Sequence, residues 1–191
     1  MSDADDMHPR FCALVLPHLD AAYNLARWLT RSDADAEDVV QESCVRALRY
    51  LDSLRGDEAR PWLLTIVRHT GYSWLRRNRP ADVVALEDID EALRDGTAPS
   101  ADEPLAAALR NADRAQINRA IEALPIAFRE VLVMRELEDL SYRDIARVAG
   151  IPIGTVMSRL ARARRLMQQA LRPGPRPLLQ AVPKVAAGGA K

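Results

Sequence analysis

The segment Ser141–Leu171 constrains the fold of this chain more than any other part of the sequence. Ser141 and Asp144 resemble a capping box at the start of a short helix, which Gly150 and Pro152 then interrupt. Apolar residues follow at spacings of four, three, four and four, one stripe of a helical period: Val156, Leu160, Ala163, Met167 and Leu171. A short helix, a glycine turn and a longer helix predict a helix-turn-helix, whose second helix enters the DNA major groove.

The side of the longer helix away from that stripe is basic. No acidic residue lies three or four positions from its arginines within the helix, so helical ion pairs do not explain them. We predict that Ser158, Arg159 and Arg162 read bases, and that Arg164 and Arg165 meet phosphates. The alternative is a solvated helix whose arginines pair with carboxylates from elsewhere in the chain. The candidate DNA contacts are Thr155, Ser158, Arg159, Arg162, Arg164 and Arg165.

A second basic helix is expected from Ala59 to Arg77. Its expected buried stripe consists of Leu63, Ile66, Val67, Thr70 and Trp74. An aromatic ring among arginines suits unstacked single-stranded bases, because a ring and a guanidinium can each stack on a base. Tyr72 could instead be an ordinary surface tyrosine. The candidate single-strand contacts are Arg68, His69, Tyr72, Arg76, Arg77 and Arg79.

The preceding helix, expected from Ala34 to Leu51, begins with an acidic block. Carboxylates near a helix N-terminus offset the macrodipole, which explains Asp35 and Asp38 but explains Glu42 poorly. An acidic docking face for a basic protein is the competing interpretation, with Asp35, Asp38, Gln41 and Glu42 as its residues. The expected inward side of this helix is Val40, Cys44, Ala47, Leu48 and Leu51.

Across the whole chain, the sequence predicts an all-α fold of two small helical domains joined by an acidic flexible linker, the C-terminal domain containing the helix-turn-helix. No alternation typical of strands is visible, and 48% hydrophobic content excludes disorder of the whole chain. The expected parts are an N-terminal extension (1–9), a first helical domain (10–80), the linker (81–106), a second domain (107–172) and a disordered tail (173–191). A solvated helix over 86–94 is the alternative to a flexible linker. The remaining helices are expected at Pro9–Leu16, Pro17–Thr30, Ala107–Ala123, Ile126–Glu138, Tyr142–Ala149 and Gly154–Leu171.

Several classes of protein and site are disfavoured. No apolar run is long enough to insert into a membrane, and the acidic start differs from a signal peptide, so a cytoplasmic protein is expected. Cys12 and Cys44 lack the spacing of a zinc or redox site. With no Gly-rich phosphate loop, metal cluster or catalytic triad, we expect neither an enzyme nor a cofactor, and no catalytic or metal-binding residue is assigned.

Three stretches in this order resemble the extracytoplasmic-function group of the bacterial sigma-70 family: "DAEDVVQESCVRAL", "RPWLLTIVRHTGYSWLRR" and "ALPIAFREVLVMRELEDLSYRDIARVAGIPIGTVMSRLARAR". The resemblance implies that the first domain docks its acidic helix on a coiled coil of the largest subunit of core RNA polymerase. It implies that the loop 51–60 and the following helix melt and read the −10 element of promoter DNA, and that the last domain reads the −35 element. It also implies an anti-sigma factor as a partner. His69, Ser73 and Met157 depart from the residues that many relatives carry at these positions.

Two other functions fit parts of the pattern. A sigma-like decoy would bind an anti-sigma factor without binding promoters, but it would not need two arginine-rich segments that lack acids. A free-standing dimeric repressor would also use a helix-turn-helix.

Overall fold

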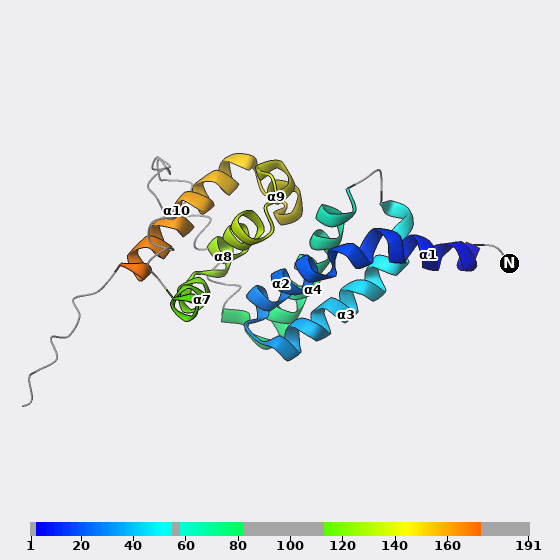
Figure 1. Ribbon diagram of the computed structural model, residues 1–191, viewed down its shortest axis with the longest axis horizontal. Coiled ribbons are helices and arrows are strands. Elements are labelled where there is room, and N and C mark those ends of the chain that lie inside the picture. The colour runs from blue at the N-terminus through cyan, green and yellow to red at the C-terminus, as the bar shows by residue number, and fades with distance from the viewer. Residues whose placement is uncertain (1–2, 55–57, 82–112, 173–191) are drawn as a thin grey trace, which may run out of the picture.

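The computed structural model describes residues 3–54, 58–81 and 113–172. Within them the chain is all-helical and forms two domains side by side (Figure 1), as the sequence predicts. The expected linker and tail lie outside the described residues, as does the start of the helix expected from Ala107. No helix among the described residues is both long and apolar enough to cross a membrane.

The first domain contains α1 (Asp3–Val15), α2 (Leu19–Thr30), α3 (Asp33–Arg49) and α4 (Ala59–Asn78). The helix expected from Pro9 begins earlier, at Asp3, and Pro17 lies in a 3₁₀ turn, Leu16–His18, before α2. The Ser32 hydroxyl caps α3 by accepting a hydrogen bond from the Asp35 backbone N–H. Helices α2, α3 and α4 pack on one another around Leu25, Leu29 and Leu63, which are fully or almost fully buried.

The second domain contains α7 (Arg114–Ala123), α8 (Ile126–Leu132), α9 (Tyr142–Ala149) and α10 (Ile153–Leu171). The helix expected over 126–138 is present in two parts, α8 and the π-helical turn Val133–Leu137 that continues it. The predicted helix-turn-helix is present. Gly150 closes α9 with a φ of 67°, a left-handed conformation that suits glycine. All five residues of the predicted stripe on α10 are buried: Val156, Leu160, Ala163, Met167 and Leu171.

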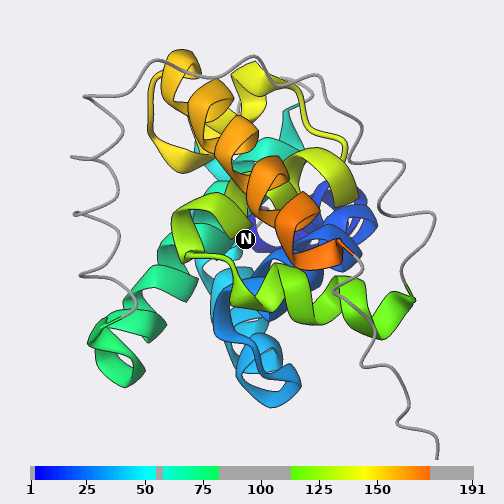
Figure 2. The same ribbon diagram turned by 90° about the vertical axis from the view of Figure 1, so that its left-hand side faces the viewer.

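The helices of the two domains lie side by side (Figures 1 and 2), and buried residues of both belong to one apolar core. Leu25 and Leu64 of the first domain belong to the same apolar cluster as Met134 and Ile145 of the second. Trp28 of α2 packs against the cluster formed by α7, α8 and α10. Helix α4 lies against α9, and α2 lies against α8. Helix α4 is therefore covered partly by helices of its own domain and partly by the second domain.

Candidate nucleic-acid interface

The outer face of α10 is open at most of the predicted positions. Arg162 and Arg165 are exposed, and Thr155 and Ser158 are half-buried. Met157, which interrupts the basic face, is 52% exposed. The helix therefore presents two exposed cations and two hydroxyls beside an apolar side chain, a composition that suits a groove contact.

Arg159 does not lie on that face. It is 1% exposed, and its Nη1 lies 3.3 Å from Oε1 of Glu130, a fully buried carboxylate on α8 of the same domain. The prediction that Arg159 reads a base is not supported by this placement, because α8 packs against α10 and covers the edge at which Arg159 lies. Arg164, at the other edge, pairs with Glu136 at 2.7 Å. The alternative of arginines paired with carboxylates from elsewhere thus holds for these two residues.

On α4, Arg68 and Tyr72 lie in the interface between the domains. Arg68 donates Nε and Nη2 to the two carboxylate oxygens of Glu130, at 2.7 and 3.1 Å, and stacks over the Tyr72 ring at 4.3 Å. Burial alone would lower the pKa of Arg68, but the carboxylate of Glu130 raises it above its ordinary value. Burial, with the nearby Glu130 charge, raises the pKa of Tyr72 well above its usual range. Tyr72 is buried and the Arg68 side chain is 13% exposed, so the greater part of both is covered in this conformation.

The predicted buried stripe of α4 is correct only in part. Leu63, Val67 and Thr70 are buried, whereas Ile66 and Trp74 are only half-buried. Tyr72, expected on the outer side, is 5% exposed. The reason is that α4 is covered on two sides, by α2 and α3 on one and by α9 on the other. A single apolar stripe therefore does not predict which residues of this helix are buried.

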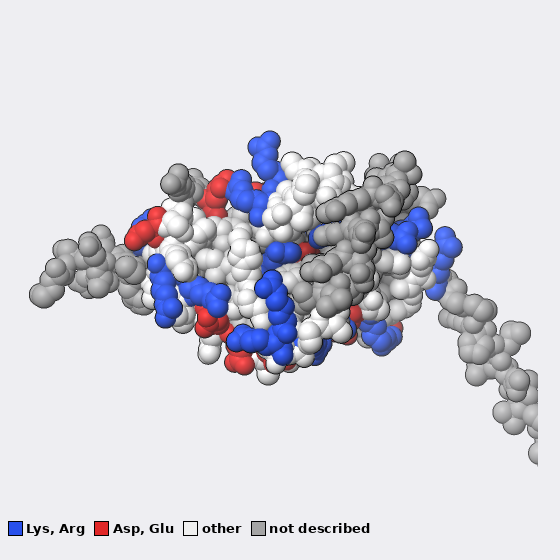
Figure 3. Space-filling model, turned by 180° about the vertical axis from the view of Figure 1, so that it is seen from behind, with Lys and Arg blue, Asp and Glu red and all other residues white. Residues whose placement is uncertain are grey.

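The C-terminal turns of α4 extend clear of the second domain (Figure 2). Arg76 and Arg77 are exposed, and Arg79 lies over the Trp74 ring at 5.7 Å. His69 is also exposed. Partial burial and the charges of Arg68, Arg46 and Arg76 hold the pKa of His69 below its ordinary value, which favours the neutral imidazole. Figure 3 shows a band of basic side chains across the middle of the face behind that of Figure 1.

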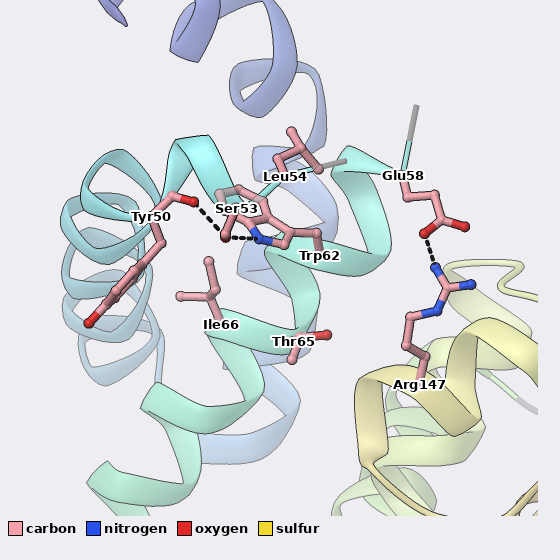
Figure 4. Close-up of a pocket in the computed structure, with 8 residues that line it drawn as sticks. All are labelled: Tyr50, Ser53, Leu54, Glu58, Trp62, Thr65, Ile66 and Arg147. Carbon is pink, nitrogen blue, oxygen red and sulfur yellow. Dashed lines mark hydrogen bonds and ion pairs between the residues drawn. The ribbon is translucent and has the colours of Figure 1, made fainter. Parts of the chain in front are cut away.

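A pocket of about 420 Å³ opens beside the start of α4 (Figure 4). Its walls are largely apolar and aromatic, and the Trp62 Nε1–H donates to the Ser53 hydroxyl at 3.2 Å. Glu58 and Arg147, from the two different domains, form an ion pair at its edge. Residue spacing gave no signal for this pocket, although the loop 51–60 was predicted to take part in binding. Its lining is Tyr50, Ser53, Leu54, Glu58, Trp62, Thr65, Ile66 and Arg147.

The predicted protein-docking residues lie together on α3. Asp38, Gln41 and Glu42 are exposed and Asp35 is half-buried in the first turn. Arg46 donates Nε to Glu42 at 2.8 Å and lowers the pKa of that carboxyl.

Leu48 was expected inside but is 40% exposed, and Val45 is 48% exposed. Asp38, Gln41, Val45 and Leu48 follow one another at spacings of three, four and three along α3. Val45 was not predicted as a surface residue of this face, and Leu48 was predicted to be buried. Their helical spacing from Gln41 is the sequence signal that could have identified both.

Comparison with known proteins gives a consistent result. Residues 14–81 match the family described as Sigma-70 region 2, and residues 114–167 match Sigma-70, region 4. The RNA polymerase sigma-H factor of Pseudomonas aeruginosa is 37% identical over 167 residues, which cover 85% of this chain and 86% of the relative. The ECF RNA polymerase sigma-E factor of Escherichia coli (strain K12) is 38% identical over 144 residues, 73% of this chain and 75% of the relative.

Two similar solved structures are complexes. One is the sigma factor RpoE with the anti-sigma factor NepR from Bartonella quintana, with a TM-score of 0.62 and 28% identity over 82% of this chain and 93% of that one. The other is CnrH with the cytosolic domain of CnrY, with a TM-score of 0.53 and 26% identity over 84% and 86%. The matched regions and the near full-length relatives place the chain in the extracytoplasmic-function group of the sigma-70 family of RNA polymerase sigma factors.

Proposed function

We propose that three separate surfaces make the binding contacts of this sigma factor, which directs promoter-specific transcription initiation. Helix α3 docks on a coiled coil in the largest subunit of core RNA polymerase. Helix α4 and the loop before it bind the melted −10 element, and α10 binds the −35 duplex.

The observation that carries the proposal is the exposed seam of α3. Asp38, Gln41, Val45 and Leu48 have the three-and-four spacing with which helices pack in coiled coils. The N-terminal half of the seam is polar and carries the acidic Asp38, and its C-terminal half is apolar. Such a face fits a helical partner that offers basic side chains beside an apolar row.

The pocket beside α4 supports the −10 contact. Its apolar and aromatic walls can hold one unstacked base, with Trp62 as a stacking surface. Arg76 and Arg77 lie in the last turn of the same helix and Arg79 directly follows it, so the three can follow the phosphates of the single strand. Contacts by Arg68 and Tyr72 would require the second domain to move away.

The exposed side of α10 supports the −35 contact. Arg162 and Arg165 are the accessible cations, and Thr155 and Ser158 offer hydroxyls to base edges or phosphates. Met157 can touch a thymine methyl. Arg159 orients the helix on α8 through Glu130 rather than reading a base, and Arg164 is held by Glu136.

An anti-sigma factor is the second protein partner that we propose. It is supported by the two similar structures, whose sigma factors are each bound to such a partner or its cytosolic domain. The protein would meet both this partner and the polymerase in the cytoplasm.

The experiment that tests the docking surface is Leu48→Asp, with binding to core polymerase and promoter-dependent transcription in vitro as readouts. An aspartate in the apolar half of the seam should weaken core binding about tenfold or more, since each tenfold corresponds to about 1.4 kcal/mol. Leu16→Asp is the matched control, because Leu16 is 47% exposed but lies in the turn between α1 and α2. Equal core binding by the two variants would contradict the proposed surface.

A further inference from the structure

The first two turns of α10 carry no charge. From Pro152 to Ser158 the sequence contains no Lys, Arg, Asp or Glu, and the first cation after it, Arg159, is only 1% exposed. Arg162 is the first exposed cation of the helix, and it lies roughly two and a half turns after Ile153. The start of α10 therefore offers different chemistry from its basic middle.

Two large apolar side chains of this uncharged start face solvent. Ile153 is 45% exposed and Met157 is 52% exposed. They are four positions apart in the sequence, so they lie one above the other on one side of the helix, about 6 Å apart along its axis. One exposed apolar side chain needs no explanation, but two neighbours at the start of a DNA-binding helix indicate an apolar contact.

Gly154 lies beside this pair and leaves the helix backbone uncovered. It is exposed, and a Cβ at this position would meet no atom within 4 Å, so packing of the domain does not require a glycine here. Its φ is not positive, so the backbone conformation does not require one either. Alanine would be the more stable residue inside a helix. A glycine at this position lets another molecule approach the backbone closely.

The helix-turn-helix directs these residues toward base edges. In this motif the N-terminal residues of the second helix contact bases in the major groove, and α10 is that second helix. Thymine presents a methyl group in the major groove, and apolar side chains contact it. Guanine is read there by Arg or Lys, which the first two turns of α10 lack. The start of α10 is therefore matched to thymine and not to guanine.

We infer that Met157, together with Ile153, reads the C5-methyl groups of thymines in the −35 duplex and sets the base preference of this sigma factor at those positions. The inference rests on the proposed contact of α10 with the −35 element, and it adds the class of base that the helix selects. Because the two side chains are one turn apart and base pairs are about 3.4 Å apart, the two thymine positions should be separated by no more than about two base pairs.

A methyl contact has two measurable properties. Burial of one such group corresponds to about a fourfold gain in affinity. The contact involves no charge, so the preference for the methyl group should not change with salt concentration, whereas binding through phosphates weakens as salt rises. Uracil pairs as thymine does and lacks only the methyl group. Replacement of a single thymine by deoxyuridine therefore isolates the contact.

The test uses holoenzyme assembled from the full chain and core RNA polymerase. Selection from promoter-length duplexes with a randomised upstream element gives the preferred sequence, and each thymine in it is then replaced singly by deoxyuridine. The readout is the Kd of the deoxyuridine duplex divided by the Kd of the thymine duplex. We expect a ratio of about four at one thymine for the unmodified chain and about one at the same thymine for Met157→Ala. Ile153→Ala should remove the preference at the second thymine.

Leu137→Ala is the matched control. Leu137 is 50% exposed in the same domain but lies outside α10, in the π-helical turn, so this variant should keep the fourfold ratio. Met157→Arg is a further variant, and a repeated selection with it should yield guanine in place of the thymine that Met157 reads. All of the substituted side chains are exposed, so the melting temperatures should stay close to that of the unmodified chain.

The outcomes separate this inference from the proposed function. A ratio near one at every thymine in the unmodified chain, or a fourfold ratio that persists in Met157→Ala, would overturn the inference. An unchanged selected sequence with Met157→Arg, or a loss of core binding by Met157→Ala in place of a lost base preference, would do the same. If Arg162→Ala still weakens duplex binding in those cases, the −35 contact stands and only the base assignment fails. A holoenzyme that selects no upstream sequence would contradict both.

Discussion

At the scale of single residues, Arg159 and Arg162 show which features of a side chain can be predicted from the sequence and which cannot. They lie three positions apart on α10, and both were predicted to read bases. Arg162 is exposed, whereas Arg159 is buried against Glu130. The pattern of α10 alone fixes the angle of each side chain but not the neighbour that covers it. That neighbour comes from α8, about thirty residues earlier in the chain, and no local signal identifies it.

The two arginines should therefore respond differently to alanine. Arg159→Ala leaves Glu130 with one partner fewer in a buried site and should lower the free energy of unfolding by about 3–5 kcal/mol, measured by urea denaturation. Arg162→Ala should change stability by less than about 0.5 kcal/mol. It should instead reduce the log–log salt slope of −35 duplex binding by about 0.9 if Arg162 contacts a phosphate. A stable Arg159→Ala variant with lost DNA binding would reverse these assignments.

At the scale of elements, the helix-turn-helix and the extent of α4 were predictable from the sequence, but the buried sides of α4 were not. The stripe of α10 and the turn at Gly150 depend on local spacing and on one backbone conformation, both visible in the sequence. Helix α4 buries residues on two sides, so Tyr72 lies inside and Ile66 lies partly outside. Single-helix periodicity assumes one buried side, and that assumption fails where a second domain packs on the helix.

The turn between α9 and α10 makes a quantitative prediction. Gly150 has a φ of 67°, so Gly150→Ala should destabilise the protein by about 1 kcal/mol, although a Cβ there meets no atom within 4 Å. Gly154→Ala is the control: it has equal space and ordinary helical geometry, and should be neutral or slightly stabilising. Thermal denaturation compares the two. Equal melting temperatures would show that the left-handed conformation is not maintained.

At the scale of the whole molecule, the number of domains was predictable and their arrangement was not. The residues that join the domains are the same types that bind DNA, arginines with an aromatic neighbour, so the sequence cannot distinguish the two uses. Arg68 illustrates this, because the features that predicted a nucleic-acid contact also suit a buried pair with Glu130.

Trp28 offers a test of the coupling between domains. It belongs to α2 but packs against the second-domain cluster, and Arg129 Nη1 donates to its carbonyl oxygen at 2.9 Å. Trp28→Ala should weaken the interface and split one calorimetric unfolding transition into two, because domains that lose their contact unfold separately. Trp74→Ala should lower the melting temperature of the single transition without splitting it. The reason is that Trp74 packs against the shared core from the α3 side. A single transition in both variants would show that Trp28 does not couple the domains.

The π-helical turn Val133–Leu137 gives the molecule a dependence on residue count as well as on residue type. Within it the Glu138 N–H reaches the Val133 carbonyl, five positions back, at 3.1 Å. A π-helical turn holds one residue more than an α-helical turn, so removing one residue here would restore the ordinary pitch and leave the chain beyond it near its present angle. Each residue of a regular α-helix advances the chain by about 100° around its axis, so removing one residue from α8 ahead of the turn would instead rotate Glu138 away from Arg60 and Asn24, which donate hydrogen bonds to it. The contact between the two halves of the protein should therefore tolerate a deletion inside the π-helical turn better than a deletion inside α8.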